Sequence, residues 1–436
     1  KTILKLSFNK AMLYSIGVKK PLRYPLPQEW QDALFNQNVE VDRLSCTLLW
    51  YGYSLLIWVY SILKSLKNLY YLLKKSRKLN RHIYFHNLNN NNIPLKNKGN
   101  TIINWYFQWD NRAEGIDTIC HNISDTSDTT HIKTDIVFTD GLPYLDSTQF
   151  LLYCVWFTGM SFYTFVIGLF NPYPAIMLNE SIKLLRVRIA TKDQLADDYL
   201  FHQSAPFYRP LWTYEAEKKS SRILLYFYST NTEPLKISKS IAIPFPYHLM
   251  SWSHYLVWDK YQAKFIRSVN SNNSIIEEVG FIWFSSSSKE ILLKERSAIA
   301  VFDIPPARQS FFITLGSSNE FYTSKVANQF LNDIQEVLAQ NNYNMVHKMK
   351  RNVNDRRVRS CSKYNYNIKM LQTKPNYHKV DANLDALSLI EKSLATISMP
   401  FTSTAKIARL SDKPSVYYDP TGMIEKDNIS AHEIPV

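Results

Sequence analysis

The chain has 436 residues, of which 45% are hydrophobic and 20% are charged. This composition excludes a wholly disordered chain, and the length indicates two or three domains. Only 10 glycines occur and none of them form a Gly-x-Gly pattern, so the dinucleotide-binding fingerprint and the phosphate-binding P-loop are both absent. Kinases, P-loop NTPases and typical NAD enzymes are therefore excluded.

The charge balance predicts an anionic partner. The chain carries 51 basic and 37 acidic residues, a net charge of +14. Such an excess suits a phosphate, a nucleotide, an acidic glycan or a lipid headgroup. The four cysteines include no Cys-x-x-Cys pair, which argues against a disulfide framework and against a thiolate zinc site, so a reducing compartment is expected.

The first long apolar stretch covers residues 44–63, which carry no charge. At 1.5 Å per residue, a helix of this length would cross the hydrocarbon layer of about 30 Å. The sequence then adds basic residues and no acidic one: Lys64, Lys67, Lys74, Lys75, Arg77, Lys78 and Arg81. This pattern is typical of a membrane element whose cationic end faces anionic lipid. A spanning helix, a peripheral membrane contact and a buried core helix all fit it.

A second uncharged stretch runs from residue 147 to residue 179. Its length suits another membrane element, but the prolines near it suit the core helix of a large domain equally well. Between the two stretches, residues 86–141 are polar and include four consecutive asparagines. We expect this segment to form irregular surface structure.

From about residue 195 the sequence changes to alternating strands and helices. Short runs of β-branched and aromatic residues predict strands at 223–228, 254–258, 277–284, 298–303, 343–348, 394–399 and 414–418. Helical spacing predicts helices after Thr323 and Ser324, at 385–393 and at 404–410. Alternation at this pace indicates right-handed βαβ units and a parallel sheet.

Three regions are expected along the chain. Residues 1–110 form a helical, basic N-terminal region with a membrane element, residues 111–290 an α/β domain, and residues 291–436 a second α/β domain. The boundary near residue 290 falls in a serine-rich segment. The chain begins with Lys1 rather than methionine and ends directly after a proline, so both ends are expected to be cut and the second domain to be truncated.

A candidate anion site follows the strand at 394–399. Pro400 ends this strand, and the hydroxyl-bearing Thr402, Ser403 and Thr404 open the next helix. In a doubly wound sheet, ligands bind beyond the carboxyl ends of the strands, where the N–H groups and dipole of a helix start attract phosphate or carboxylate. An ordinary helix cap that binds nothing is the alternative.

A basic segment supports this anion site. Lys348, Lys350 and Arg351 stand where another strand should end at the same rim of the sheet, so their charges are placed to meet a bound phosphate. The alternative is a solvated basic loop.

The densest polar and aromatic cluster covers residues 195–222. Asp198, His202 and Glu215 stand there among large aromatic side chains, a mixture that binds sugars by stacking and hydrogen bonding. A carboxylate or histidine in such surroundings is a candidate general base. A buried ion pair between Arg209 and Glu215 is the structural alternative.

No divalent metal site is expected. The sequence contains no Asp-x-Asp pair to bridge a metal to a nucleotide diphosphate. His82 and His86 are four residues apart, but they have no third ligand and lie beside a basic run.

Several segments in this order resemble the bacterial polysaccharide biosynthesis proteins that are named for their PFTS motif, which stands here at residues 400–403. The resemblance covers roughly residues 195–436 and depends on LADDYLFHQSAPFYRPLWTYEAEKKSSRILLYFYSTN, AIAVFDIPPARQS, HKMKRN, ISMPFTSTAKIARLSDKPSVYYDPTG and KDNISAHEIPV. Such proteins are linked to the assembly of O-antigen, capsule and other surface glycans. Glu433 stands where the resemblance leads us to expect glycine, which argues against a tight turn there.

The resemblance also implies a fold and a site. These proteins are similar to glycosyltransferases of the GT-B type, so the implied fold class is α/β, with two Rossmann-like domains and an N-terminal helical, membrane-associated extension. It implies that Pro400–Thr404 and Lys348–Arg351 lie in a donor-nucleotide cleft. Asp303 and residues 417–419, including Tyr418 and Asp419, would border that cleft, with the cluster at 195–222 on its far side.

The predicted function is that of a metal-independent glycosyltransferase that moves a sugar from a nucleotide-sugar to a surface polysaccharide or O-antigen acceptor, without a further cofactor. Glu215, His202 and Asp198, in that order, are the candidates for the catalytic base. The alternative is a non-catalytic, membrane-associated assembly factor that binds a glycan or lipid-linked precursor. A membrane surface is an expected partner and nucleic acid is not. The expected location is the cytoplasmic face of the inner membrane, reached by peripheral contact or a single anchor.

Overall fold

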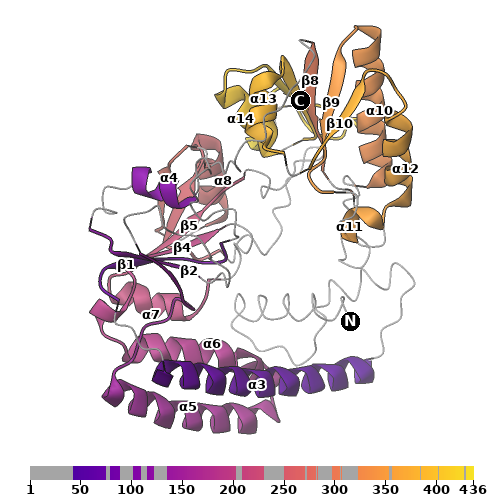
Figure 1. Ribbon diagram of the computed structural model, residues 1–436. Helices are drawn as coiled ribbons and strands as arrows, with labels where there is room; N and C mark the ends of the chain where they lie inside the picture. The colour runs from indigo at the N-terminus through magenta and orange to yellow at the C-terminus, as the bar shows by residue number, and fades with distance from the viewer. Residues whose placement is uncertain are drawn as a thin grey trace.

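The structure is a computed structural model. It describes residues 43–74, 79–88, 102–109, 115–121, 135–202, 209–229, 250–270, 273–280, 282, 297–304, 306, 323–352, 356–382, 384–400, 402–426 and 429–436. Two parallel β-sheets organise these residues into two domains, with a layer of long helices beneath the first (Figure 1).

The layer of long helices consists of α3 (Arg43–Lys74), α5 (Ser147–Gly168) and α6 (Pro172–Ile189). α5 begins with a capping box, in which Asp146 and Gln149 each bond the other's backbone N–H at 2.9 Å. Asn171 caps α6 and Pro172 occupies its first position, which proline's missing N–H and fixed φ favour. The prolines after the second uncharged stretch therefore start a new helix.

α5 is not the core helix that one interpretation of its sequence favoured. Only Tyr153, Phe157, Ser161 and Thr164 of its 22 residues are buried. It is the one described helix that is long and apolar enough by composition to cross a bilayer. Its apolar surface is therefore left largely uncovered by the rest of the described chain.

The first sheet has seven strands in the order β3-β2-β1-β4-β5-β6-β7, and all neighbours run parallel. The strands are β1 (His82–Phe85), β2 (Thr118–His121), β3 (Asp135–Phe138), β4 (Asp198–His202), β5 (Arg222–Tyr226), β6 (His254–Val257) and β7 (Ile275–Glu278). β1 lies in the middle of the sheet, so the first α/β domain draws on residues before 111.

Helices cover both faces of this sheet. The remaining helical elements of this domain are α4 (Ile102–Trp109), η3 (Lys192–Gln194), α7 (Trp212–Lys218) and α8 (Lys260–Val269). Alternate strand residues such as Tyr199 and Leu225 pack with α6, α7 and α8, whereas Leu200 and Leu224 pack on α4. Because each face is buried, the strands are apolar almost throughout.

The expectation of irregular structure at 86–141 was wrong, because α4, β2 and β3 lie inside it. β2 and β3 have four residues each. Such short strands between polar segments give only a weak signal in the sequence.

The second sheet has five parallel strands in the order β10-β9-β8-β11-β12. The strands are β8 (Ala298–Phe302), β9 (Asn344–Lys348), β10 (Tyr377–Val380), β11 (Ala395–Ser398) and β12 (Ser415–Tyr417). The helices are α10 (Ser324–Gln340), α11 (Arg356–Arg359), α12 (Ser362–Leu371), α13 (Ala386–Lys392), α14 (Ser403–Leu410) and η5 (Ile429–Ala431).

These helices again form two layers. α10 and α12 pack on the face that carries Val301 and Met345, and α13 and α14 pack on the face that carries Ala300 and Phe302. Figure 1 shows the two pairs on opposite sides of the second sheet. Apolar contacts are continuous from this second face into the first domain.

The expected fold class, α/β with two Rossmann-like domains, is confirmed. The strands predicted around 223–228, 254–258, 298–303, 343–348, 394–399 and 414–418 are all present, as are the predicted helices, with small shifts at their ends. The domain boundary expected near residue 290 lies outside the described residues.

Candidate functional site

The second sheet changes direction of winding between β8 and β11, because β9 and β10 lie to one side of β8 while β11 and β12 lie to the other. In open α/β sheets, ligands bind beyond the carboxyl ends of the strands at such a switch point. Asp303 directly follows β8, and residues 399–402 directly follow β11. The PFTS segment therefore lies at the position where this fold class binds ligands.

The threonine hydroxyls of the PFTS segment bond within the segment. The Thr402 hydroxyl donates to the Met399 carbonyl at 3.0 Å and lies 3.1 Å from the Thr404 hydroxyl, which lies 2.9 Å from the Ser398 hydroxyl. Thr402 is only 6% exposed. These side chains thus fix the shape of the turn into α14, and the N–H groups of the first helical turn are the donors that the segment directs outward.

Ser403 has a different neighbour. Its hydroxyl lies 2.5 Å from the hydroxyl of Ser229, which follows β5 of the first domain. The serine of the PFTS motif therefore joins the two domains at the carboxyl edges of their sheets. Ser403 was predicted to take part in nucleotide binding, and nothing in the sequence indicated Ser229 as its partner.

The basic residues lie on the other side of β8. Lys348 is in register with Phe302, and Phe302 is in register with Ser398. Lys348 and Ser398 are therefore two strand spacings apart, about 10 Å. The Lys348 ammonium donates to the Ala382 carbonyl at 2.9 Å, while Lys350 and Arg351 are exposed beyond the end of β9.

The surrounding protein lowers the pKa values of the two lysines in this basic segment. Desolvation lowers the pKa of Lys348, against the opposing effect of Asp385. Desolvation also lowers the pKa of Lys350, and the positive charge of Arg351 adds to the effect. The neighbouring positive charges of Lys350 and Arg351 repel each other, and this favours binding of an anion beside them.

A buried polar network supports the strands between these two features. Asp303 is 3% exposed, and its carboxylate lies 3.3 Å from Nε2 of His347 and accepts the Tyr364 hydroxyl. His347 is also 2.7 Å from the Tyr377 hydroxyl through Nδ1. Burial would raise the pKa of Asp303, but His347, the Tyr364 hydroxyl and the backbone N–H of Lys350 together outweigh it and lower that pKa. This network fixes the ends of β8 and β9 and is enclosed by protein.

Tyr418 and Asp419 lie at the carboxyl edge of the second sheet, where their side chains stabilise the loop that follows β12. The Tyr418 hydroxyl donates to Asp333 at 2.6 Å, and the Asp419 carboxylate accepts the N–H groups of Thr421 and Ile424, both at 2.8 Å. The Tyr418 hydroxyl and the Asp419 carboxylate, which the sequence predicted to border a ligand, thus form hydrogen bonds within the protein.

The first sheet has its own switch point between β1 and β4. His86 follows β1 directly, and His202 is the last residue of β4. The His86 ring lies 4.9 Å from the ring of Phe201, centroid to centroid. Of the three predicted base candidates, His202 is the one that lies at the carboxyl edge of the sheet. His86 was missed, although it follows the strand-like run at 82–85.

Both histidines are held in the neutral form near pH 7. Burial is the main cause that lowers the pKa of His86 to about 4, and the proximity of His202 and Lys183 adds to it. Burial also lowers the pKa of His202, against the opposing effect of its bond to the Asn87 carbonyl. Because Nε2 of His202 lies 3.2 Å from that carbonyl, it must carry the proton, and the basic lone pair is on Nδ1.

Asp198 and Glu215 lie elsewhere. Asp198 begins β4, about 13 Å along the strand from His202, and its buried carboxylate accepts from Arg222 and from the Tyr106 hydroxyl. Glu215 lies on α7 and pairs with Arg188 at 2.9 Å and Lys218 at 3.1 Å. Its hydrogen bond from Arg188 lowers its pKa.

The ion pair expected between Arg209 and Glu215 was also wrong. Arg209, which precedes α7, pairs instead with Glu217 near the end of that helix at 2.7 Å. Arg209 also stacks over the Tyr214 ring at 4.0 Å. This cluster stabilises α7 and takes no place at the carboxyl edge of the sheet.

A second tie between the domains forms at Asp259. One carboxylate oxygen caps α8, and the other accepts from Lys406 at 2.5 Å and from Nδ1 of His432 at 2.8 Å. Burial would raise the pKa of Asp259, but His432 and Lys406 outweigh it and hold that pKa well below its usual range. The carboxyl edges of the two sheets therefore meet through Ser229 and Asp259.

The turn at 432–433 corrects another expectation. A tight turn does form there, with φ of 51° at His432 and 63° at Glu433. Left-handed backbone is unfavourable for residues other than glycine. Arg409 donates to the Glu433 carbonyl, and the Glu433 carboxylate lies 3.6 Å from the Lys260 ammonium. These contacts, together with His432 on Asp259, hold the turn.

We expect Asp259→Asn to lower the melting temperature at neutral pH, because asparagine keeps the helix cap but loses the charge. A carboxyl group whose pKa is depressed by folding stabilises the fold above its unfolded pKa of about 4, and this contribution is lost as the pH falls further. The difference between Asp259→Asn and the wild type should therefore shrink below about pH 4. Glu391→Gln, at an exposed position on α13, is the control. A difference that stays constant down to pH 3 would contradict this account.

No group of three or more histidine, cysteine, aspartate or glutamate side chains among the described residues is placed to hold a metal ion. Lys350 and Arg351 supply positive charge beyond the end of β9, and the N–H groups that begin α14 supply partial positive charge. Any negative charge bound there would be met by these groups.

Two Rossmann-like sheets that meet at their carboxyl edges define an α/β protein of the GT-B architecture. The family model described as polysaccharide biosynthesis PFTS motif protein matches residues 145–436. The chain belongs to this family. The matched region starts before α5, so it includes the α5–α6 hairpin. It also includes β4 to β12 and the segments that follow these strands at the carboxyl edges of the two sheets.

Solved structures with a similar arrangement include two glycan or sugar enzymes. A structure of the wall teichoic acid polymerase TagF is 10% identical with a TM-score of 0.37, and the match covers 84% of this chain and 78% of that one. The α,α-trehalose 6-phosphate synthase from Burkholderia multivorans is 10% identical with a TM-score of 0.40, over 78% of this chain and 83% of that one. No curated protein matches the chain.

Proposed function

We propose that the protein is a glycosyltransferase that moves a sugar from a nucleotide-activated donor to a growing surface glycan. The observation that carries the proposal is the meeting of two carboxyl edges, one with the PFTS turn at its switch point and the other with a pair of neutral histidines. An anion-binding edge opposite a basic nitrogen is the arrangement that sugar transfer needs.

The donor's phosphate would rest at the start of α14. The first-turn N–H groups and the helix dipole supply donors for its oxygens, and Lys350 and Arg351 lie about two strands away at the end of β9. These groups would stabilise the negative charge on the departing nucleotide without a divalent metal. No cofactor beyond the donor itself is part of the proposal.

His202 would act as the general base. Nδ1 takes the proton from an acceptor hydroxyl, the hydroxyl oxygen bonds to the anomeric carbon of the sugar, and the bond from that carbon to the phosphate oxygen breaks. The electron pair of that bond leaves with the nucleotide phosphate. His86, the neighbour across the switch point, would position the acceptor or share the proton.

The acceptor in this proposal is a glycan carried on a lipid, such as an O-antigen precursor. Transfer would then take place at the cytoplasmic face of the inner membrane, where such a carrier presents its head group. The apolar helices α3 and α5, on the underside of the first domain in Figure 1, support this placement.

We expect the double variant Lys350→Ala/Arg351→Ala to weaken nucleotide binding at least tenfold, because charge-assisted hydrogen bonds contribute about 1.5 to 3 kcal/mol each. Titration calorimetry with CMP, UDP and GDP measures the effect and also identifies the nucleotide. Lys363→Ala/Lys369→Ala removes the same charge from exposed positions on α12 and should leave affinity unchanged.

Equal affinity of both double variants and the wild type would contradict the donor site. Wild-type protein that binds a nucleotide-sugar but transfers nothing to any glycan acceptor would instead favour a non-catalytic assembly factor. The two outcomes are distinct, because the first removes the site and the second keeps it.

A further inference from the structure

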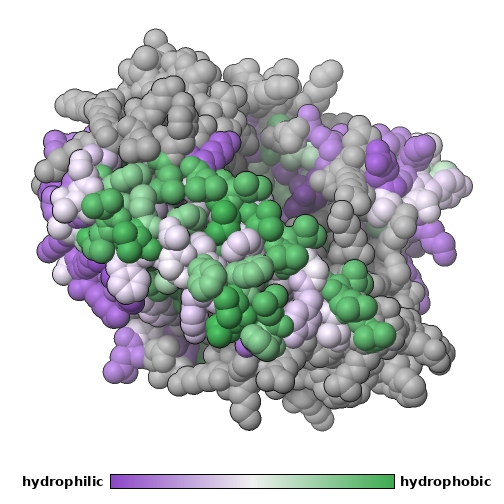
Figure 2. Space-filling model, turned by 90° about the horizontal axis from the view of Figure 1, so that it is seen from below, coloured by the Kyte–Doolittle hydropathy of each residue, from purple (hydrophilic) through white to green (hydrophobic). Residues whose placement is uncertain are grey.

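The described part of the chain exposes an unusual amount of apolar side chain on one face. Nineteen of its twenty-seven exposed large hydrophobic residues belong to α3, to α5 and to the two residues after α5. Figure 2 shows a broad hydrophobic area on the underside of the molecule, where these helices lie. Patches of this size on soluble monomers mark sites of interaction.

α3 packs on the protein through serines and tryptophans and turns most of its leucines outward. Its buried stripe is Trp50, Ser54, Ser61 and Ser65, whereas leucines such as Leu56, at 69% exposure, point outward. A helix on the surface of a water-soluble domain shows the reverse pattern. The arrangement is the one that helices adopt against lipid, where small and hydroxyl-bearing residues form the helix contacts.

α5 repeats this pattern. Ser161 and Thr164 face the neighbouring helix, and the indole N–H of Trp58 on α3 lies 3.3 Å from the Ser161 carbonyl and 3.2 Å from the Thr164 hydroxyl. Leu151 and Phe162 are 67% and 71% exposed. The hydrogen bonds of the pair are thus inside, and most of the large apolar side chains of α5 are outside.

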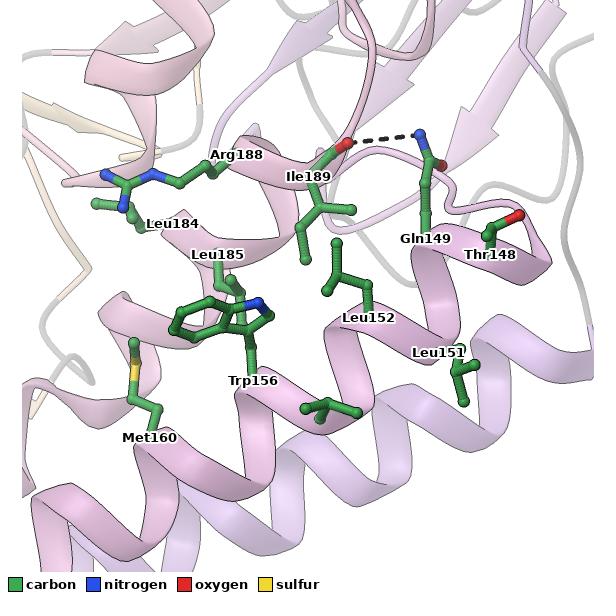
Figure 3. A pocket seen from close by; sticks show the side chains of 11 residues that line it. Thr148, Gln149, Leu151, Leu152, Trp156, Met160, Leu184, Leu185, Arg188 and Ile189 are labelled. Atoms are coloured by element: carbon green, nitrogen blue, oxygen red, sulfur yellow. Dashed lines mark hydrogen bonds between the residues drawn. The ribbon is translucent and has the colours of Figure 1, made fainter.

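A groove between α5 and α6 extends the apolar face. Leu152, Trp156, Leu184, Leu185 and Ile189 are among the residues that line it. Figure 3 shows Trp156 rising from α5 beside Leu185, with Arg188 on the opposite wall. The groove suits a hydrocarbon chain and has a guanidinium on its wall.

The charges of the two helices point to an anionic surface. Neither α3 nor α5 contains an acidic residue, and α5 contains no charged residue at all. Lys64 and Lys67 are exposed on α3, and the Lys64 ammonium lies 5.9 Å from the centre of the Tyr60 ring. In the sequence, five more basic residues follow between Lys74 and Arg81. Basic residues beside an apolar face bind anionic lipid by about 1 kcal/mol each.

The neighbours of α5 determine how it meets the membrane. At 22 residues it would measure about 33 Å, enough to span. However, α6 packs along it and carries Glu180, Lys183, Arg186 and Arg188. A spanning α5 would draw these charges into hydrocarbon, at a cost of several kcal/mol.

We infer that α3 and α5 form a docking surface that lies in the plane of one leaflet of an anionic phospholipid bilayer. The outward leucines and aromatic rings sink to the level of the acyl chains, and Lys64 and Lys67 contact the headgroup phosphates. The inference does not depend on the proposed sugar transfer, because it uses none of the residues at the interdomain edge.

The first test is sedimentation of the full chain with vesicles of phosphatidylcholine alone and of phosphatidylcholine mixed with phosphatidylglycerol. The wild type should bind the mixed vesicles at least tenfold more tightly. Leu56→Glu/Phe162→Glu should lose at least tenfold of that affinity, whereas Val337→Glu, at an exposed position on α10, should retain it. Equal binding by all three proteins would overturn the inference.

A second test needs only the wild type and one mild variant. Lipids brominated near the headgroup should quench tryptophan fluorescence more than lipids brominated at the chain ends, and Trp156→Phe should reduce the effect. Stronger quenching by the deep label would refute the in-plane arrangement. A dimer in solution that fails to bind vesicles and that Leu56→Glu/Phe162→Glu separates would assign the surface to a second copy and overturn the inference.

Discussion

Replacing His202 with alanine should reduce sugar transfer by roughly 10² to 10⁴-fold, the usual contribution of a general base. Donor affinity should stay the same, because His202 lies on the first sheet and the proposed phosphate contacts lie on the second. The measurement is the transfer rate at saturating donor, combined with titration calorimetry for the donor. The pH profile should also lose its acidic limb, since His202 must be neutral to accept a proton.

Glu215→Gln is the matched control for this variant. Glu215 was the first choice from the sequence, but it is held by Arg188 and Lys218 away from the carboxyl edge. We expect its transfer rate to remain within a factor of a few of the wild type. Full activity in His202→Ala together with a large loss in His86→Ala would move the base to the neighbouring strand. Full activity in both would remove the histidine pair from the mechanism.

Asp198→Ala should destabilise the protein by about 3 to 5 kcal/mol, the usual effect of breaking a buried ion pair. Asp198 is 3% exposed, and its replacement would remove the buried carboxylate to which Arg222 and the Tyr106 hydroxyl donate. Unfolding in urea, followed by fluorescence, measures the change. The same variant should keep its transfer rate per folded molecule, because Asp198 is remote from the carboxyl edge.

The adjacent residue provides the control. Asp197 pairs with Arg81 at 3.0 Å, but both side chains are about half exposed, so Asp197→Ala should change stability by no more than about 1 kcal/mol. Similar losses in the two variants would show that the burial of Asp198 does not decide its role. A folded Asp198→Ala protein without transfer activity would return Asp198 to the list of catalytic candidates.

The sequence predicted the second domain well because its strands and helices follow a regular pattern. Runs such as 298–303 are continuously apolar, and α10 shows clear helical spacing after its Thr323 cap. The PFTS turn was also placed correctly after β11. The partner of Ser403 was not predictable, since Ser229 lies 174 residues away and in another domain.

The sequence could not separate the three base candidates of the first domain, for a physical reason. β4 has five residues, and Asp198 and His202 are its two polar ends. In the sequence they stand four residues apart in one polar and aromatic cluster, and nothing there distinguishes their roles. The strand places them at opposite edges of the sheet, one buried in an ion pair and the other at the switch point. Only the strand order, which depends on long-range pairing, tells these two roles apart. The same order identifies His86.

The sequence alone also could not tell whether α3 and α5 lie in a protein core or at a surface. An apolar helix in a core and one at a lipid surface share their composition, so length and hydropathy left both open. The distinction comes from which side chains are turned inward. Serines line the contact in α3 while leucines face out, and that can be seen only once the packing partner is known.

The described contacts that join the domains lie on one side of the molecule. Ser229 and Asp259 follow β5 and β6, and their partners belong to α14 and the C-terminal turn. In the first sheet, β1 and β4, which carry His86 and His202 at their ends, precede β5 in the strand order, and in the second sheet β9 lies on the other side of β8 from β11. If the domains separate to exchange ligands, these contacts at Ser229 and Asp259 would act as the hinge. A ligand held between the two edges would then leave on the side away from Asp259 and His432.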